Sequence, residues 1–163
     1  MTIRVGDKLP AATFTVMGAD GPAPASTADV FDGKKVVLFA VPGAYTPTCH
    51  KGHMPGFVRD VDAIKAKGVD TVACTSVNDV FVMDAWAKDS GAKGKIEMLA
   101  DGSADFVQKL GLEIDLTARG LGLRSNRYAM LVDDGVVKIL NVEAAPPNHE
   151  SSSAAHMLSQ IGE

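Results

Sequence analysis

The 163-residue sequence has only two cysteines, Cys49 and Cys74. Two cysteines are too few for a disulfide scaffold in a chain of this length, so a fold that depends on several disulfides is excluded. In a reducing compartment, two such residues are better suited to a transient chemical role than to a permanent bridge. The cysteines are therefore the first candidates for a functional site.

Basic residues are not in excess, and long apolar runs are missing. The 16 lysines and arginines are scattered and are outnumbered by 20 acidic residues, which gives a net charge of −4, so we expect no nucleic-acid partner. Residues 1–10 lack the apolar core of a signal peptide, and no run is long enough to span a bilayer. We therefore expect a cytoplasmic protein with no membrane partner. The length predicts a single domain over residues 1–163.

The most informative stretch surrounds Cys49 and follows an apolar, β-branched run at residues 36–41. That run is too short for a globular helix and predicts a buried strand that stops at Pro42. Thr46 followed by Pro47 predicts a helix start, because threonine can cap free amides of the first turn and proline loses nothing at the next position. Cys49 then falls in the first helical turn, where unpaired amides and the helix dipole favour a thiolate.

Free cysteines also commonly serve as small buried hydrophobic residues, so Cys49 could be purely structural. Here, however, a strand end, a Pro-Gly turn, a Thr-Pro cap and the cysteine all fall within residues 41–49. Each feature lies where a reactive thiolate would need it. We therefore favour a nucleophilic sulfur at a strand-to-helix corner.

Strand and helix patterns alternate along the rest of the chain. Further strands are predicted at residues 12–17, 69–76, 96–100, 128–132 and 136–142, the last two joined by an Asp-Gly hairpin turn. Helices are predicted at residues 47–68 with a kink at Pro55, at residues 80–90 and 101–110, and from a cap at residues 151–153 to about residue 161. The glycine-containing residues 111–125 predict an ordered loop. Together these elements predict an α/β fold with a mixed sheet between helices.

Three segments resemble one protein family. Val-Pro-Gly-Ala-Tyr-Thr-Pro-Thr-Cys at residues 41–49, followed by His53 and by Pro-Gly-Phe at residues 55–57, resembles the active-site signature of the peroxiredoxins. Residues 76–86 and 122–138 resemble further signatures of the atypical type II, or peroxiredoxin-5-like, branch. The resemblance implies a thioredoxin-like fold with a central mixed β-sheet flanked by helices. It also implies a thiol peroxidase that reduces hydrogen peroxide and alkyl hydroperoxides without a cofactor.

The resemblance also implies roles for individual residues. Cys49 matches the peroxidatic cysteine that becomes a sulfenic acid, and Thr46 matches the threonine that orients the peroxide. Pro42 matches the proline that shields the sulfur from water, although Thr46 and Pro42 could serve only as helix cap and strand terminator. Arg124 matches the pocket arginine, whose fixed charge suits the negative charge that develops as the O–O bond breaks. We therefore expect Arg124→Ala to slow peroxide reduction more than Arg127→Ala, although such arginines are often surface groups.

His50 and His53 beside Cys49 form a Cys-His-x-x-His pattern, which could suggest a metal site. The spacing matches no familiar zinc site, and a fourth ligand is missing. We therefore expect neither a metal nor another cofactor.

Two routes could regenerate Cys49. Cys74 lies on the predicted strand at residues 69–76, where plant-like members of the branch also have a cysteine, so it could resolve the sulfenic acid or be a buried bystander. We lean towards a bystander or a slow resolver. The animal-like form uses a cysteine near the last helix, but residues 151–153 are serines here. Glutathione with glutaredoxin, or thioredoxin, would then act as reductant, and the resemblance further implies a homodimer packed through loops near the active site.

Two other functions are alternatives to the peroxidase. A thiol–disulfide oxidoreductase of thioredoxin type would normally have a C-x-x-C pair, but His50, Lys51 and Gly52 follow Cys49. A redox-sensing or binding module of the same fold, without efficient turnover, would keep every residue assigned above. Multiple turnover with a thiol reductant separates that module from a peroxidase.

Overall fold

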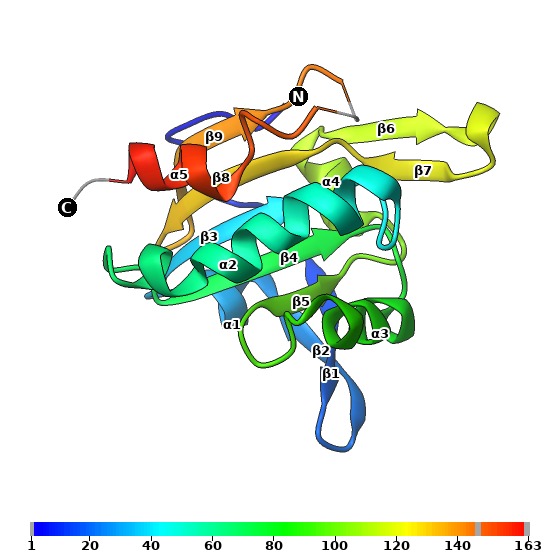
Figure 1. The fold of residues 1–163 in the computed structure, drawn as a ribbon, viewed down its shortest axis with the longest axis horizontal. Coiled ribbons are helices and arrows are strands. Elements are labelled where there is room, and N and C mark those ends of the chain that lie inside the picture. Colours follow the sequence, from blue (N-terminus) through cyan, green and yellow to red (C-terminus); the bar gives the residue numbers. More distant parts are fainter. Residues whose placement is uncertain (1, 146–147, 162–163) are drawn as a thin grey trace.

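The computed structural model describes residues 2–145 and 148–161, and its centre is a seven-stranded sheet with the order β2-β1-β5-β4-β3-β8-β9 (Figure 1). The strands of this sheet are β1 (Thr13–Gly18), β2 (Gly21–Ser26), β3 (Lys35–Ala40), β4 (Thr71–Ser76), β5 (Glu97–Ala100), β8 (Tyr128–Asp133) and β9 (Val136–Val142). The sheet is mixed, because β4 pairs in parallel with β3 and β5 while the other pairs are antiparallel.

Helices cover both faces of this sheet. One face carries α2 (Met54–Lys65), α3 (Val80–Ser90) and α5 (Ala154–Gln160), and the other carries α1 (Thr27–Phe31) and α4 (Asp105–Leu110) (Figure 1). The predicted α/β fold with a central mixed sheet flanked by helices is therefore confirmed. Among residues 2–145 and 148–161, no helix combines the length and the apolar character needed to cross a membrane.

β3 shows why the amino-acid sequence of a central strand is almost continuously apolar. Side chains alternate across a strand, so Val37 and Phe39 face the core beneath α2, α3 and α5, whereas Val36 and Leu38 face the core beneath α1 and α4. All four side chains are fully buried. This burial on both faces explains why the position of β3 could be predicted from its composition.

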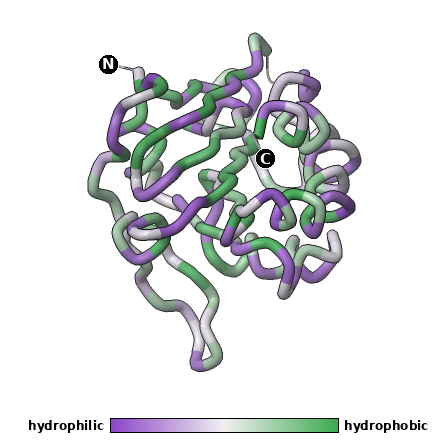
Figure 2. The backbone as a smooth tube through the Cα atoms, turned by 90° about the vertical axis from the view of Figure 1, so that its left-hand side faces the viewer, coloured by the Kyte–Doolittle hydropathy of each residue, from purple (hydrophilic) through white to green (hydrophobic). Residues whose placement is uncertain are grey.

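Two hairpins follow from local turn chemistry. In the β8–β9 hairpin, Asp134 and Gly135 have positive φ angles of 49° and 79°, as the predicted Asp-Gly turn requires. The N-terminal strand forms a hairpin with β2, in which Pro22 and Pro24 are tolerated because β2 lies at the edge of the sheet. Figure 2 shows this hairpin extending from the body of the protein with a hydrophilic tip.

The predicted loop at residues 111–125 was wrong. The segment contains β6 (Glu113–Leu116) and β7 (Gly122–Ser125), which pair antiparallel and are joined by the 3₁₀ turn Thr117–Arg119. The alternation Glu-Ile-Asp-Leu in β6 was the available signal, and it is weak because the strand is so short.

The helix predicted to begin at Asp101 begins instead at Asp105. The Asp101 carboxylate remains outside the helix and accepts hydrogen bonds from the amides of Phe106 and Val107, each at 3.0 Å. Asp101 thus caps the helix from outside it and satisfies amides of the first turn.

Candidate active site

Cys49 lies where the chain turns from the sheet into a helix. After β3 ends, Pro42 and Gly43 redirect the chain, and helical bonding begins at Thr46, whose carbonyl accepts from the His50 amide at 2.8 Å. Cys49 is fully buried in this first helical region. The predicted strand-to-helix corner is therefore present, and it places Cys49 at a helix start.

The helical segment that carries Cys49 is a π-turn, Cys49–His53, that leads directly into α2. The Met54 amide donates to the Cys49 carbonyl, one residue further back than an α-helical bond would reach. Pro55 then lies in the first turn of α2, where a residue without an N–H is tolerated. The irregularity expected as a kink at Pro55 therefore lies one turn earlier, around the cysteine itself.

The side chain that contacts the sulfur is Arg127, between β7 and β8. Its Nη2 donates to Cys49 Sγ at 3.0 Å, and its Nη1 donates to Nδ1 of His53 at 3.0 Å. Arg127 and His53 are each only 2% exposed, and Cys49 is fully buried. A guanidinium can only donate, so it stabilises negative charge on the sulfur or on an atom bound to the sulfur.

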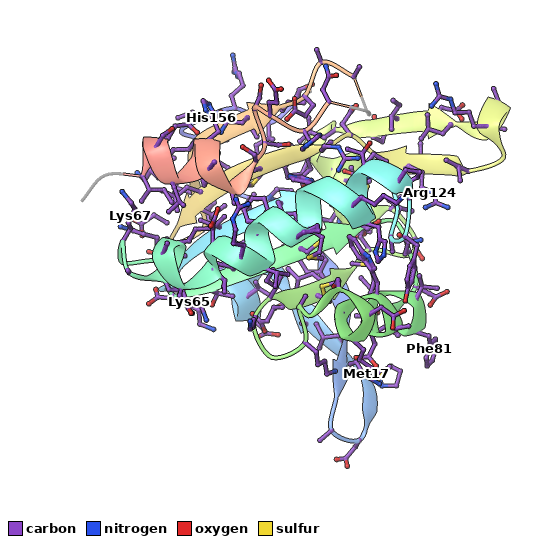
Figure 3. The ribbon with its side chains drawn as sticks, viewed as in Figure 1. Met17, Lys65, Lys67, Phe81, Arg124 and His156 are labelled. Carbon is purple, nitrogen blue, oxygen red and sulfur yellow. The ribbon has the colours of Figure 1, made fainter. Side chains whose placement is uncertain are left out.

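Arg124, the arginine favoured from the sequence, lies at the rim of the same site. Its Nε donates to the Leu121 carbonyl at 2.8 Å, and its Nη1 donates to the Pro42 carbonyl at 3.3 Å. Figure 3 shows the side chain beside the N-terminal end of α2. Arg127 and not Arg124 is therefore the arginine bonded to Cys49, and the expected ranking of their alanine variants by rate stays a prediction.

Strand alternation was the signal that could have identified Arg127. It immediately precedes β8, and two-residue periodicity puts it on the same face as Ala129 and Leu131. These two residues belong to the core cluster that includes Cys49. Arg124, in contrast, belongs to the separate β6–β7 sheet.

The loop before Cys49 is packed closely around Gly43. The Thr46 hydroxyl donates to the Gly43 carbonyl at 2.6 Å, and Pro42 is buried. A Cβ at Gly43 would lie 2.8 Å from Nη1 of Arg124 and 3.0 Å from Cγ2 of Thr46. A side chain at this position would therefore displace Arg124 or Thr46, which explains the need for glycine.

Side chains in and before α3 hold the same corner, and sequence reasoning missed them. Asn78 Oδ1 accepts from the Ala44 amide at 2.9 Å, whereas the N-cap of α3 is the next residue, Asp79. The Trp86 indole N–H donates to Nδ1 of His50 at 3.0 Å. The loop and the π-turn are therefore each tied to the neighbouring helix.

His53 is neutral in this site. Burial is the main cause that lowers the pKa of His53 from 6.5 to about 3, and the charge of Arg127 lowers it further. The Ser152 carbonyl, 2.8 Å from Nε2, can only accept, so the proton lies on Nε2 and Nδ1 accepts from Arg127. Both ring nitrogens are therefore engaged. Within the described ranges, no three His, Cys, Asp or Glu side chains gather in a way that could hold a metal ion.

Cys74 lies on β4, fully buried in the same core cluster as Cys49. Burial is the main cause that raises the pKa of the Cys74 thiol, the nearby Cys49 raises it further, and Arg127 opposes the shift. Both cysteines are free thiols. A protonated thiol is a poor nucleophile, so Cys74 is not primed to attack in this conformation.

Comparison with known proteins gives consistent matches over nearly the whole chain. The family model described as Redoxin matches residues 4–158. Peroxiredoxin-2E, chloroplastic, from Arabidopsis thaliana is 48% identical over 170 residues, which cover 98% of this chain and 70% of that protein. Peroxiredoxin-2B from the same organism is 47% identical over 143 residues, which cover 87% of this chain and 88% of that protein.

A solved structure shows the same arrangement of elements. The crystal structure of reduced Prx3 in complex with H2O2 from Vibrio vulnificus is 50% identical in sequence and matches with a TM-score of 0.94. The match covers 99% of this chain and 100% of that chain. It therefore includes the central sheet and the corner that carries Cys49.

Proposed function

Because this chain belongs to the Redoxin family, and within it to the peroxiredoxins, it is a thiol-dependent peroxidase with a thioredoxin-like fold, and we propose that Cys49 is the cysteine that attacks the peroxide. One contact carries this proposal: Nη2 of Arg127 donates to Cys49 Sγ at 3.0 Å in a buried site. A fixed cation at this distance favours the thiolate, which is the reactive form of the cysteine.

In the proposed step, the Cys49 thiolate attacks one oxygen of the hydroperoxide. A sulfur–oxygen bond forms while the O–O bond breaks, the departing oxygen takes up a proton and leaves as water or an alcohol, and Cys49 is left as a sulfenic acid. Negative charge moves from the sulfur to the departing oxygen. Arg127 and the amides of the first helical turn are fixed donors at this place, so they stabilise the transition state more than the ground state.

Three further residues are proposed to shape the peroxide pocket. Arg124 supplies a second guanidinium at the rim, supported by its 3.3 Å bond to the Pro42 carbonyl. Thr46 orients the peroxide and the thiolate from the first helical turn, where its hydroxyl is held by the neighbouring loop. Pro42 is buried beside this loop and keeps water from the sulfur.

We propose hydrogen peroxide and alkyl hydroperoxides as substrates. Two observations support a small peroxide in particular. The similar Prx3 from Vibrio vulnificus was solved in complex with H2O2. In addition, Cys49 is fully buried, so a compact molecule reaches the sulfur with the least displacement of the surrounding side chains.

We propose that glutathione with glutaredoxin, or thioredoxin, reduces the oxidised Cys49. This assignment is supported by the state of Cys74, which is fully buried and has a raised thiol pKa. Attack by Cys74 on a sulfenic acid would need a local rearrangement that lowers this pKa. An external thiol avoids this requirement, which supports Cys74 as a bystander or a slow resolver.

We propose a homodimer as the working assembly. Its support on this chain is Phe81, which projects from α3 and is 65% exposed (Figure 3). α3 also contacts the active-site corner through Trp86, and a large exposed apolar side chain on such a helix is typical of an interface. The cytoplasmic location expected from the sequence stays a prediction.

The experiment that tests the proposed chemistry is intact-mass analysis of the reduced protein after one equivalent of hydrogen peroxide, with peptide mapping. Rapid oxidation at Cys49 that is lost in Cys49→Ser is the expected result. A lasting sulfenic acid would indicate an external reductant, and a Cys49–Cys74 disulfide would make Cys74 the resolver. If Cys49 stays reduced as long as an ordinary thiol does, the assignment of Cys49 fails.

A further inference from the structure

Glu143 and Ser152 form a buried pair behind the active site. Glu143 follows β9, and Ser152 precedes α5. The Glu143 carboxylate accepts from the Ser152 amide at 2.6 Å and from the Ser152 hydroxyl at 2.7 Å, both through Oε2. Glu143 is 6% exposed and Ser152 is fully buried. A buried carboxylate with two such bonds defines the position of the chain at Ser152 closely.

This pair continues into the active site through His53. The Ser152 carbonyl accepts from Nε2 of His53 at 2.8 Å, and Nδ1 of His53 accepts from Arg127 at 3.0 Å. Arg127 then donates to Cys49 Sγ at 3.0 Å. A continuous series of hydrogen bonds therefore links the carboxylate to the sulfur.

Two further contacts join the same segments. The Glu143 amide donates to the Arg127 carbonyl at 2.9 Å, so the pair is attached to the backbone of the arginine as well as to its side chain. The chain just before Ser152 also lies against the π-turn, because a Cβ at Gly52 would come within 3.1 Å of Nε2 of His149. From Ser152 the chain enters α5, which packs against α2 (Figure 1).

Building on the proposed roles of Cys49 and Arg127, we propose that Glu143 and Ser152 are positioning residues of the peroxidase. They hold the Ser152 carbonyl on Nε2 of His53, which keeps Nδ1 turned towards Arg127 and the guanidinium on the Cys49 sulfur. Neither residue touches the reacting atoms.

The physical reason is the freedom of an arginine side chain. Its rotamers are numerous, so a guanidinium is useful as a transition-state donor only when its other bonds hold it in place. His53 holds the guanidinium only when Nδ1 of its ring faces Arg127. In a flipped ring, the N–H at Nε2 would face the N–H groups of Arg127, and two donors cannot form a hydrogen bond. The Ser152 carbonyl selects the correct orientation, and Glu143 holds that carbonyl in place.

The first test is the second-order rate constant for hydrogen peroxide, measured by competition with a haem peroxidase. Glu143→Gln keeps the shape but removes the charge, and we expect its rate to fall roughly tenfold. Ser152→Ala removes one of the two bonds, and we expect a fall of about threefold. Ser151→Ala is the matched control, because Ser151 is exposed, and its rate should equal that of the wild type.

The decisive test combines Glu143→Gln with Arg127→Lys. If Glu143 acts through Arg127, its substitution should change the rate by less than about twofold once the guanidinium has been replaced. An equal loss in both backgrounds, or a fall in Tm with an unchanged rate, would make Glu143 a structural anchor and overturn the proposal. Should Glu143→Gln fail to fold, Ser152→Ala is compared in the same way, once in the wild-type protein and once combined with Arg127→Lys.

Two substitutions of His53 separate its two bonds. Asparagine places its Oδ1 near the position of Nδ1 and keeps an acceptor for Arg127, whereas glutamine places its amide near Nε2 and keeps only the bond to Ser152. We expect His53→Asn to be faster than His53→Gln, and the reverse order would overturn the proposal. Failure of the proposed function looks different: the wild-type protein would then react no faster than an ordinary thiol, or Cys49→Ser would keep the wild-type rate.

Discussion

The Arg127 side chain is charged, buried and held in an orientation that points its guanidinium at the Cys49 sulfur. Two of its nitrogens are held by Cys49 Sγ and by Nδ1 of His53, so the guanidinium is oriented before any peroxide arrives. Such preorganisation is worth more in a buried site than the same contact would be in water. Arg124 is half-buried and bonded to backbone carbonyls, which suits it to shaping the rim of the pocket.

We expect Arg127→Ala to lower the second-order rate constant for hydrogen peroxide by roughly a hundredfold or more, because it removes a donor aimed at the developing charge. Arg124→Ala should lower the rate by less than about tenfold, because its bonds are to the loop and not to the sulfur. Stopped-flow or competition kinetics would measure both, with Arg127→Lys as a control for the loss of buried volume. A larger effect for Arg124→Ala would restore the ranking that was inferred from the sequence.

His53 should make the protein less stable in acid. Its pKa is about 3 in the folded protein and 6.5 when unperturbed, so between these values the unfolded chain binds a proton that the folded chain does not. The stability that follows from neutral His53 is therefore complete above pH 6.5 and is lost as the pH falls towards 3. Between pH 7 and pH 5 we expect a loss of about 2 kcal/mol from this group.

Urea unfolding at the two pH values would measure this loss. The non-titrating variant His53→Asn serves as the reference, because every other group contributes equally to both proteins. Its unfolding free energy should change less between pH 7 and pH 5 than that of the wild type. Parallel pH dependence in the two proteins would contradict the assignment of a depressed His53 pKa.

The loop between β3 and the π-turn is held by contacts from two other parts of the chain and by one contact within the loop. Asn78 holds the Ala44 amide, Arg124 holds the Pro42 carbonyl, and the Thr46 hydroxyl closes the loop onto Gly43. Each contact satisfies a backbone group or a hydroxyl that has no partner in a regular helix or strand. The loop therefore keeps one conformation, although its own residues form no strand.

Asn78→Ala should loosen this loop. It leaves the Ala44 amide without its acceptor, and we expect a loss of about 1–2 kcal/mol in unfolding free energy and a roughly tenfold slower reaction with peroxide. Asn78→Asp keeps an acceptor oxygen at the same place and should stay close to the wild type in both measurements. Thermal unfolding and peroxide kinetics would show whether the alanine variant alone is affected.

Among the described residues, few large apolar side chains are exposed at the surface. Phe81 on α3 is 65% exposed and Tyr45 in the active-site loop is 41% exposed, whereas Val5 is exposed at 59% close to the N-terminus. Tyr45 is anchored, because its hydroxyl donates to Asp89 at 2.6 Å, and this bond is the main cause that raises the pKa of Tyr45 to about 12. Phe81 is therefore the better probe of the proposed homodimer.

Phe81→Lys should convert a dimer into a monomer, because it places a charge where an apolar side chain would be buried. Sedimentation velocity at micromolar concentration would report the change. Val5→Lys introduces the same charge at another exposed apolar position and should leave the assembly unaltered. A wild-type protein that sediments only as a monomer would count against the dimer.

Local sequence pattern was sufficient for most of the architecture. Residues 36–41 could be recognised as a buried strand because both of their faces are covered, and Asp79, Ser153 and the Asp-Gly turn act within a few residues of their own position. The strand-to-helix corner at Cys49 could also be predicted from neighbouring residues, because a strand end, a turn and a helix start follow one another directly. Such features need no knowledge of the rest of the chain.

The surroundings of the sulfur depend on contacts that no local pattern contains. Arg127 is separated from Cys49 by 78 residues, and Ser152 is separated from His53 by 99. The sequence favoured Arg124 as the pocket arginine, whereas Arg127 is bonded to the sulfur, because this contact depends on which strand face meets the π-turn. Hydrogen bonds between distant segments are selected by the packing of the whole sheet, so only the folded chain brings Glu143, Ser152, His53 and Arg127 into one series behind Cys49.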